Sequence, residues 1–236
     1  MIDLHGRNIN KLRISLTEVC NMACTYCVTS LSDHKRAPDE LGADEMLSLV
    51  RMLKEHAGIE KVRLTGGEPL LYPNLIPVIS GIREMGISSI GLTTNGQLLA
   101  RKAKALVEAG LKNVNLSLDS LDPENFKRMG RVGKLRKTLE GVEACLKYGL
   151  KVKVNMVVVK GENDDEIVKM LEYTTGKFLN LKINTNASLL NERKSHAILQ
   201  NDVRTLVFSA DAADSELYSS LRVNGKLSKV VSNIKQ

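Results

Sequence analysis

Between Lys11 and about Lys177, short runs rich in β-branched residues alternate with longer amphipathic stretches. This alternation is typical of repeated βα units on a parallel sheet, so the expected fold class is α/β. The pattern predicts five strands, at residues 11–17, 61–67, 89–95, 113–119 and 151–159. It also predicts five helices, at residues 42–57, 75–86, 98–110, 134–149 and 163–176.

The predicted strands carry polar side chains along one face, because residues i and i+2 of a strand share a face. That face holds Arg13, Ser15, Thr17, Arg63, Thr65, Thr93, Asn95, Asn115, Ser117, Asp119, Lys153 and Asn155. A purely structural barrel fills its interior mainly with bulky branched side chains, so the polar face indicates a ligand cavity inside a barrel. An open sheet with one solvated face is the alternative. The intervening helices disfavour it, because parallel sheets are usually covered on both sides.

The chain also contains an internal repeat. TTNGQLL at residues 93–99 recurs as NTNASLL at 184–190, and GKLRK at 133–137 recurs as GKLSK at 225–229. Between these segments, at an offset of 92 residues, the matching pairs are Ser117 and Ser209, Asp119 and Asp211, Asp122 and Asp214, and Glu124 and Glu216. Residues from about 182 onward therefore resemble a second copy of the third strand through the fourth helix. We expect a core at residues 1–177 and a repeated βα segment at 178–236 that continues the barrel to about seven parallel strands.

Composition narrows the class of protein. The 236 residues are 43% hydrophobic and 26% charged, which disfavours disordered and fibrous classes. Only 3% are aromatic, which leaves little for stacking nucleic-acid bases, and no apolar stretch approaches the roughly 20 residues that span a bilayer. We therefore expect a cytoplasmic protein with no nucleic-acid and no membrane partner. The net charge of +7 is spread along the chain and suits a small anionic ligand.

Three of the four cysteines form a C-x3-C-x2-C array, CNMACTYC, directly after the first predicted strand. They are Cys20, Cys24 and Cys27. Three thiolates at this spacing can hold three corners of a [4Fe-4S] cluster and leave the fourth iron without a protein ligand. Zinc is the main alternative, but a closed tetrahedral site needs a fourth ligand, and Cys145, His5 or His34 would have to come from a distance. A disulfide is disfavoured, because cysteines crowded in this way indicate metal or redox chemistry in a reducing compartment.

At these residues the chain resembles the radical S-adenosylmethionine (SAM) superfamily, whose cluster motif has this spacing and commonly an aromatic residue before the last cysteine, here Tyr26. TGGEPL at residues 65–70 resembles the superfamily's GGE element, which contacts the methionine amino group of SAM. The resemblance therefore implies SAM-binding residues at Gly66, Gly67 and Glu68. The glycines also allow close backbone approach, and Glu68 offers an anionic acceptor. It further implies a partial TIM-like barrel with two cofactors, one [4Fe-4S] cluster and SAM.

Within the superfamily, residues 1 to about 165 resemble the GTP 3′,8-cyclase family of molybdenum-cofactor biosynthesis. The matching segments are LRISLTEVCNMACTYC, KVRLTGGEPLL, LTTNGQLL, NLSLDSLDPENF and VKVNMVVVKGENDDEI, in this order and at similar spacing. This resemblance implies SAM contacts at Tyr26, Gly67 and Ser117. It implies GTP contacts at Arg13, Arg63, Thr93 and Lys153, which all belong to the polar face, and three cations around one cavity suit a triphosphate.

The resemblance also implies a reaction. The enzyme would be a lyase that reductively cleaves SAM to a 5′-deoxyadenosyl radical, and this radical abstracts a hydrogen from the GTP ribose. The electron would come from an external reductant such as flavodoxin or ferredoxin.

The chain departs from the cyclases after about residue 165. Cyclases bind a second [4Fe-4S] cluster through three further cysteines, whereas this sequence has only Cys145, where a buried core role is expected. The repeated segment resembles instead the middle of the core in peptide- and protein-modifying radical SAM enzymes. Two alternatives therefore stay open, an enzyme of that kind and a non-catalytic Fe-S and SAM-binding fusion remnant. The exposed edge of an unclosed barrel would favour a homodimer.

Overall fold

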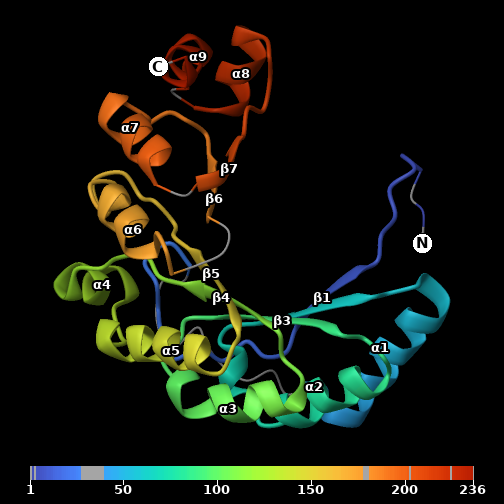
Figure 1. Cartoon of the computed structure of the whole chain (residues 1–236). Coiled ribbons are helices and arrows are strands. Elements are labelled where there is room, and N and C mark those ends of the chain that lie inside the picture. Colours follow the sequence, from blue (N-terminus) through green and yellow to red (C-terminus); the bar gives the residue numbers. More distant parts are fainter. Residues whose placement is uncertain are drawn as a thin grey trace. The chain divides into compact units, whose positions relative to one another are not determined.

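The computed structural model of the chain describes residues 2, 4–27, 40–177, 181–201, 203–223 and 225–235. Of residues 181, 182, 184 and 204 it describes the backbone alone. The chain splits into two compact units, Met1–Met156 and Val157–Gln236 (Figure 1). Within the described ranges, no helix combines the length and the apolar character needed to cross a membrane.

A five-stranded parallel sheet forms the centre of the first unit (Figure 1). In spatial order its strands are β1 (Lys11–Ser15), β2 (Lys61–Thr65), β3 (Ser89–Thr94), β4 (Asn113–Ser117) and β5 (Lys151–Asn155). The helices of this unit are α1 (Ala43–Ala57), α2 (Leu75–Glu84), α3 (Leu99–Ala109), α4 (Pro123–Gly130) and α5 (Leu135–Lys147), and the 3-10 helix η2 (Pro69–Leu71) follows β2. The α/β fold class expected from the sequence is confirmed.

The apolar face of this sheet is its buried face. Val62, Leu64, Leu92, Val114 and Leu116 are each at most 2% exposed. Helices α1, α2, α3 and α5 lie along one side of the sheet (Figure 1). Burying an aliphatic side chain of this size contributes about 1.5–3 kcal/mol, so the alternation of apolar and polar residues decides which face the helices cover. The opposite face is left to the polar side chains.

The strands end earlier than the sequence pattern predicts, and β5 shows why. The predicted strand runs to Val159, but β5 ends at Asn155. The N–H of Val159 donates to Oδ1 of Asn163 (2.8 Å), and Nδ2 of Asn163 donates to the carbonyl of Val157 (2.9 Å). The buried side-chain amide of Asn163 thus makes the backbone hydrogen bonds that a neighbouring strand would make. Residues 157–163 turn at the start of the second unit instead of extending β5.

Helix α4 is absent from the sequence-based prediction, because it is short and follows the strand closely. Its start carries a local signal: Asp122 at the N-cap accepts a hydrogen bond from the N–H of Asn125 (2.8 Å), and Pro123 occupies the first turn. Both residue types favour helix starts at these positions.

The second unit contains a two-stranded parallel sheet of β6 (Leu181–Thr185) and β7 (Val203–Phe208). Its helices are α6 (Ile167–Thr174), α7 (Glu192–Gln200), α8 (Ser215–Leu221) and α9 (Leu227–Ile234). One apolar cluster includes Leu171, Ala197 and Ile198, and another includes Tyr218 and Val230. Whether residues 178–236 continue the barrel of the first unit stays a prediction.

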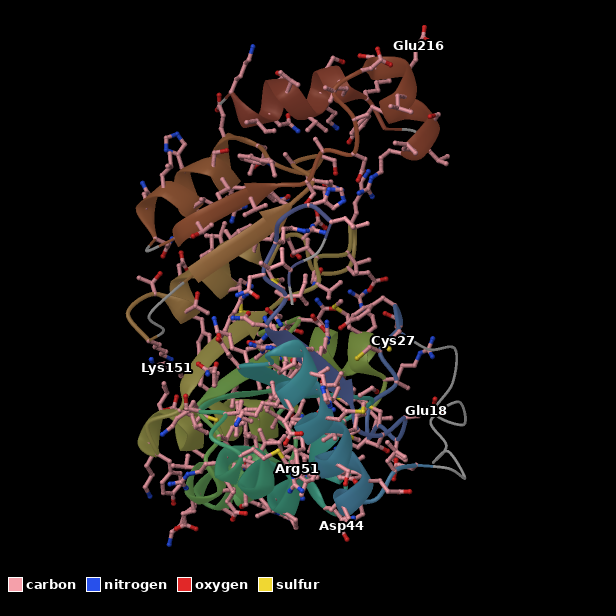
Figure 2. All side chains as sticks on the ribbon, turned by 90° about the vertical axis from the view of Figure 1, so that its right-hand side faces the viewer. Glu18, Cys27, Asp44, Arg51, Lys151 and Glu216 are labelled. Carbon is pink, nitrogen blue, oxygen red and sulfur yellow. The ribbon has the colours of Figure 1, made fainter. Side chains whose placement is uncertain are left out.

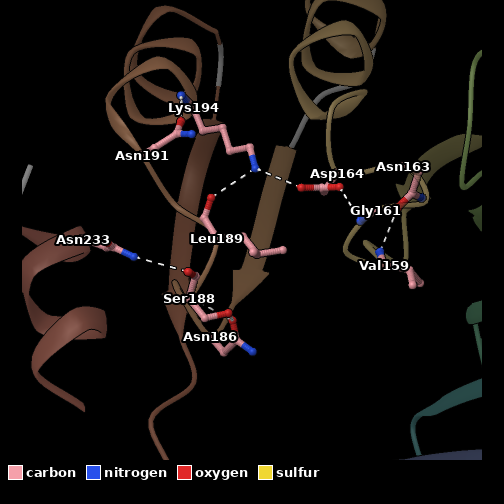
Figure 3. A network of polar contacts seen from close by, with 10 residues as sticks. All are labelled: Val159, Gly161, Asn163, Asp164, Asn186, Ser188, Leu189, Asn191, Lys194 and Asn233. Atoms are coloured by element: carbon pink, nitrogen blue, oxygen red, sulfur yellow. Dashed lines mark hydrogen bonds and ion pairs between the residues drawn. The ribbon is translucent and has the colours of Figure 1, made fainter. Parts of the chain in front are cut away.

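A polar network ties the beginning of the second unit to α7 (Figure 3). Nζ of Lys194 donates to the carbonyl of Leu189 (3.1 Å) and lies 3.8 Å from Oδ2 of Asp164. Oδ1 of Asp164 accepts a hydrogen bond from the N–H of Gly161 (2.7 Å), and Asn191 caps α7 by accepting from the N–H of Lys194 (3.1 Å). The turn that precedes α6 is therefore fastened to the helix that follows β6.

The second unit repeats the turn that ends β3. Oγ1 of Thr94 accepts from the N–H of Gly96 (3.1 Å), and Oδ1 of Asn95 accepts from the N–H of Gln97 (3.1 Å). At the end of β6, Thr185 and Asn186 make the same two bonds, to the N–H groups of residues 187 and 188, at 3.0 and 3.1 Å. The sequence repeat is therefore also a repeat of local structure.

The strand pairing repeats as well. β3 and β4 pair Thr93 with Asn115, and β6 and β7 pair Asn184 with Val207. Both pairs occupy matching positions of the repeat, so the two copies share register as well as element order.

Candidate functional site

The three cysteines lie in the loop that follows β1, at the carboxyl edge of the sheet. We call residues 18–27 the cysteine loop; Figure 2 shows Glu18 and Cys27, its two ends, on the same side of the first unit. Cys20 and Cys24 are half-buried and Cys27 is exposed, and all three are free thiols. Burial raises the pKa of Cys20 and raises that of Cys24 to about 11, and neighbouring cysteines in the loop contribute to both shifts. The three thiols are thus close enough to interact electrostatically.

The chemistry of this donor set fits an iron–sulfur cluster. Three thiolates on one loop are the ligands that a [4Fe-4S] cluster takes, each on a different iron. Among the described residues no group of three or more His, Cys, Asp or Glu side chains is arranged to hold a metal ion, so the fit to a cluster rests on the type and spacing of the three thiols. Of the proposed fourth zinc ligands, Cys145 is buried in α5 and His34 lies outside the described residues.

Two glycines after β2 let the chain pass against the entry to the cysteine loop. The N–H of Gly67 donates to the carbonyl of Thr17 (2.7 Å), and a Cβ at Gly67 would lie 2.5 Å from the carbonyl oxygens of Glu18 and Val19. Gly66 has a φ of 149°, and a Cβ there would lie 2.5 Å from the carbonyl oxygen of Thr17. No other residue type fits these positions without moving the backbone, because the chain passes directly against the backbone of residues 17–19. A contact from either glycine to SAM stays a prediction.

Glu68 joins the ends of two strands. Its side chain is 1% exposed, and its carboxylate accepts hydrogen bonds from the N–H of Leu70 (3.0 Å), Oγ1 of Thr94 (2.7 Å) and the N–H of Asn95 (2.8 Å). Burial raises the pKa of this carboxyl, while the three hydrogen bonds act in the opposite direction. Glu68 therefore holds the end of β3 against the end of β2. A direct contact from Glu68 to SAM stays a prediction.

Asn95 links the end of β3 to the cysteine loop. Its Nδ2 donates to Oδ1 of Asn21 (2.7 Å) and lies 3.9 Å from Sγ of Cys20. Because Oδ1 of Asn95 accepts from the N–H of Gln97, the orientation of the amide is determined by the turn itself.

Tyr26 links the loop to the end of β4. Its hydroxyl donates to Oδ2 of Asp119 at 2.5 Å, and burial together with the negative charge of Asp119 raises the pKa of Tyr26. The sequence assigned no anchoring role to Asn95 or Asp119. Their signal was the recurrence of the TN and SxD positions in the repeat.

The polar face presents two neighbouring cations. Arg13 on β1 and Arg63 on β2 are neighbours in register, and Arg63 lies next to Gly91 on β3. A Cβ at Gly91 would lie 3.4 Å from the guanidinium of Arg63, so this glycine leaves room for it. Nη1 of Arg63 is buried without a hydrogen-bond acceptor in the described part of the chain. Burial and the charge of Arg13 lower the pKa of Arg63.

The remaining predicted site residues lie further along the same face. Thr93 on β3 pairs with Asn115 on β4, which pairs with Lys153 on β5. Ser117 is the last residue of β4. The structure therefore brings Arg13 and Arg63 together directly, and places Thr93 and Lys153 two strands apart in one row.

Comparisons with known proteins show the family to which the chain belongs. Residues 14–174 match the sequence profile of the radical SAM superfamily. A GTP 3′,8-cyclase of Alkaliphilus oremlandii is 43% identical over 188 residues, which are 77% of this chain and 58% of that protein. A GTP 3′,8-cyclase of Clostridium perfringens is 38% identical over 231 residues, which are 95% of this chain and 70% of that protein. The second alignment extends into the repeated segment, whereas the chain spans little more than half of the first relative.

Among solved structures, the fold is similar to that of SuiB from Streptococcus suis, in crystals with its precursor peptide SuiA and with S-adenosylmethionine. The TM-scores are 0.68 and 0.65 at 18% identity, and the matches cover 86% of this chain and 49% and 48% of SuiB. This likeness confirms the expected radical SAM type of fold. From its sequence match, its relatives and its cysteine loop, the chain belongs to the radical SAM superfamily and, within it, to the family of the GTP 3′,8-cyclases.

Proposed function

We propose that this protein is a radical SAM enzyme that holds one [4Fe-4S] cluster on Cys20, Cys24 and Cys27 and acts on GTP or a similar anionic nucleotide. A cluster held there would pass an electron from an external reductant to SAM, which would be cleaved into methionine and a 5′-deoxyadenosyl radical. The observation that carries the proposal is the anchoring of the cysteine loop to the ends of β2, β3 and β4, beside a polar sheet face.

The residues around the loop would orient SAM at this edge of the sheet. Gly66 and Gly67 bring backbone without side chains to the edge, Ser117 ends β4 there, and Tyr26 stands within the loop. Glu68 acts in this proposal mainly through the strand ends that it holds, because its carboxylate already accepts three hydrogen bonds.

The residues of the polar face would bind the substrate. A triphosphate between Arg13 and Arg63 would offer an acceptor to the buried Nη1 of Arg63 and offset the repulsion between the two cations. Thr93 and Lys153 would contact the same nucleotide from the next row. Binding energy at this end would then place the ribose toward the cysteine loop.

Three further statements belong to the proposal. The chain binds no second cluster through residues of this sequence, because its remaining cysteine, Cys145, is buried in α5 and burial raises its pKa to about 12. The reductant is a flavodoxin or ferredoxin of the cytoplasm. A homodimer formed through an exposed sheet edge is the expected assembly.

The test is formation of 5′-deoxyadenosine by anaerobically reconstituted, reduced protein with SAM, in the presence and absence of GTP. We expect product in both cases and a higher rate with GTP. Cys24→Ala should abolish cluster absorbance and product together, whereas Cys145→Ala, the matched control, should retain both.

Each outcome bears on a separate part of the proposal. A rate that does not respond to GTP would reject the nucleotide substrate and favour a peptide or protein substrate. A protein with a complete cluster that forms no 5′-deoxyadenosine would reject catalysis and favour a non-catalytic Fe-S and SAM-binding remnant. A complete cluster in Cys24→Ala would contradict the ligand assignment.

A further inference from the structure

The internal repeat allows one scaffold to be compared with and without a cysteine loop. The part of the first unit from β4 through α5 corresponds to β7 through α9, at an offset of 92 residues. All four cysteines of the sequence lie in the first unit, so the copy has no cysteine loop. At the same offset, Asp119 corresponds to Asp211, and Gly130 at the end of α4 corresponds to Arg222 at the end of α8.

In the copy, the aspartate after the strand pairs with the end of the following helix. Nε of Arg222 donates to Oδ2 of Asp211, and the hydrogen bond raises the pKa of Arg222. Asp211 and its partner therefore belong to the same βα unit.

In the first unit α4 ends at Gly130, which has no side chain, and the cysteine loop lies where a side chain at this position would begin. A Cβ at Gly130 would overlap Cε of Met22, which lies in the loop. The carbonyls of Gly130 and Met129 accept hydrogen bonds from the N–H groups of Ala23 (3.1 Å) and Thr25 (2.9 Å). The last turn of α4 thus binds the loop through carbonyl groups that a helix leaves without intrahelical partners at its C-terminus, and the carbonyl of Gly130 also accepts from the N–H of Val132 (2.6 Å).

The aspartate of the first unit bonds to the loop as well. Asp119 is 8% exposed and accepts the hydroxyl of Tyr26, which lies between Cys24 and Cys27. A hydrogen bond to an ionised carboxylate is about twice as strong as a neutral one, so this contact holds the loop firmly.

We propose that Asp119 and the Gly130 end of α4 form a docking site that positions the cysteine loop. In the copy, the corresponding residues Asp211 and Arg222 bond to each other instead. Asp119 is a positioning residue, since it acts on Cys24 and Cys27 through Tyr26. The proposal rests on the proposed function only in that it treats these cysteines as cluster ligands. The docking contacts themselves exist without a cluster.

The experiment uses the full chain before and after anaerobic loading with iron and sulfide. Asp119→Leu removes the acceptor, Tyr26→Phe removes the donor, and the double variant completes a cycle. Gly130→Arg installs the side chain of the copy, and α4 keeps its negative φ there, so the backbone tolerates it. Asp211→Leu and Arg222→Gly are the matched controls in the second unit.

We measure hydrogen exchange of the Ala23 and Thr25 amides in the iron-free protein, iron and sulfide content after loading, and the unfolding temperature. Asp119→Leu and Tyr26→Phe should each raise exchange about tenfold, and the double variant should not exceed Asp119→Leu, because the Tyr26–Asp119 hydrogen bond is already absent there. Asp119→Asn, which keeps an acceptor, should show a smaller increase. Gly130→Arg should raise exchange too, because the new guanidinium competes for Asp119. The iron and sulfide retained after loading should fall about tenfold in Asp119→Leu, Tyr26→Phe and Gly130→Arg.

The controls should leave loop exchange and cluster retention unchanged. Additive effects in the double variant, or exchange unchanged in both Asp119→Leu and Tyr26→Phe, would overturn the proposal. A wild-type protein that retains no cluster would refute the proposed function, while the exchange comparison in the iron-free protein would still decide the docking site.

Discussion

Arg63 shows how a single side chain with a buried donor can lower the stability of a protein. It neighbours Arg13 in register, and its Nη1 is buried with no acceptor among the described residues. A buried donor without a partner destabilises a protein by about 1–3 kcal/mol. Because Arg13 adds repulsion of like charge, the free protein holds Arg63 at the expense of stability. An anion bound between the two guanidinium groups would reverse this loss.

Replacing Arg63 should therefore separate stability from binding. Arg63→Met keeps the packing of the aliphatic stem and removes the charge and the unpaired donor, so it should raise the free energy of unfolding by about 1 kcal/mol. The same variant should weaken GTP binding at least tenfold. Urea unfolding and calorimetric titration measure the two effects. Lys61→Met, on an exposed position of the same strand, should change stability by less than about 0.5 kcal/mol. An Arg63→Met protein that is less stable and binds GTP normally would contradict this account.

At the scale of the element, the two TN turns show how a repeat diverges. Gly96 has a φ of 80°, and a Cβ there would lie 2.7 Å from Cδ1 of Leu116 and 3.2 Å from Cγ2 of Thr138. Ala187 takes the same place after β6 with a φ of 57° and is fully buried. The backbone conformation is thus shared, but only the second unit has room for a methyl group.

Exchanging the two residues should have unequal effects. Gly96→Ala should lower the free energy of unfolding by about 1–3 kcal/mol, because it adds both a positive-φ penalty and a steric overlap. Ala187→Gly should change it by less than about 1 kcal/mol, because relief of the φ penalty is offset by a lost buried methyl group and a freer unfolded chain. Urea unfolding of both variants is the measurement. Equal losses would show that the two turns are packed alike.

At the scale of the whole molecule, the net charge of +7 acts on any anionic ligand from a distance. Salt screens such long-range interactions, since the Debye length falls from about 10 Å at 0.1 M to about 3 Å at 1 M. The association rate of GTP should therefore fall as ionic strength rises, whereas its dissociation rate, governed by close contacts such as the one proposed to Arg63, should change less. Stopped-flow binding across a salt series tests this, and a dissociation rate that carries most of the salt effect would contradict it.

The sequence by itself determined the βα pattern, the buried and polar faces of the sheet, the cysteine loop and the need for glycine after β2. Each of these follows from local information: residue periodicity, residue spacing or backbone freedom within a few positions. The sequence pattern did not predict the early strand ends or α4. After β5, the side chain of Asn163 bonds the backbone of Val159, and at the start of α4 the side chain of Asp122 caps the helix.

The tertiary structure decided which groups hold the cysteine loop. Tyr26 and Asp119 are 93 residues apart, and Asn21 and Asn95 are 74 apart. No periodicity connects positions so distant, and their contact exists because the parallel register brings the carboxyl ends of β1, β3 and β4 to one edge. The same packing buries Glu68 and leaves Nη1 of Arg63 without an acceptor in the described part of the chain, since burial depends on all the elements that surround a side chain and not on its neighbours in sequence.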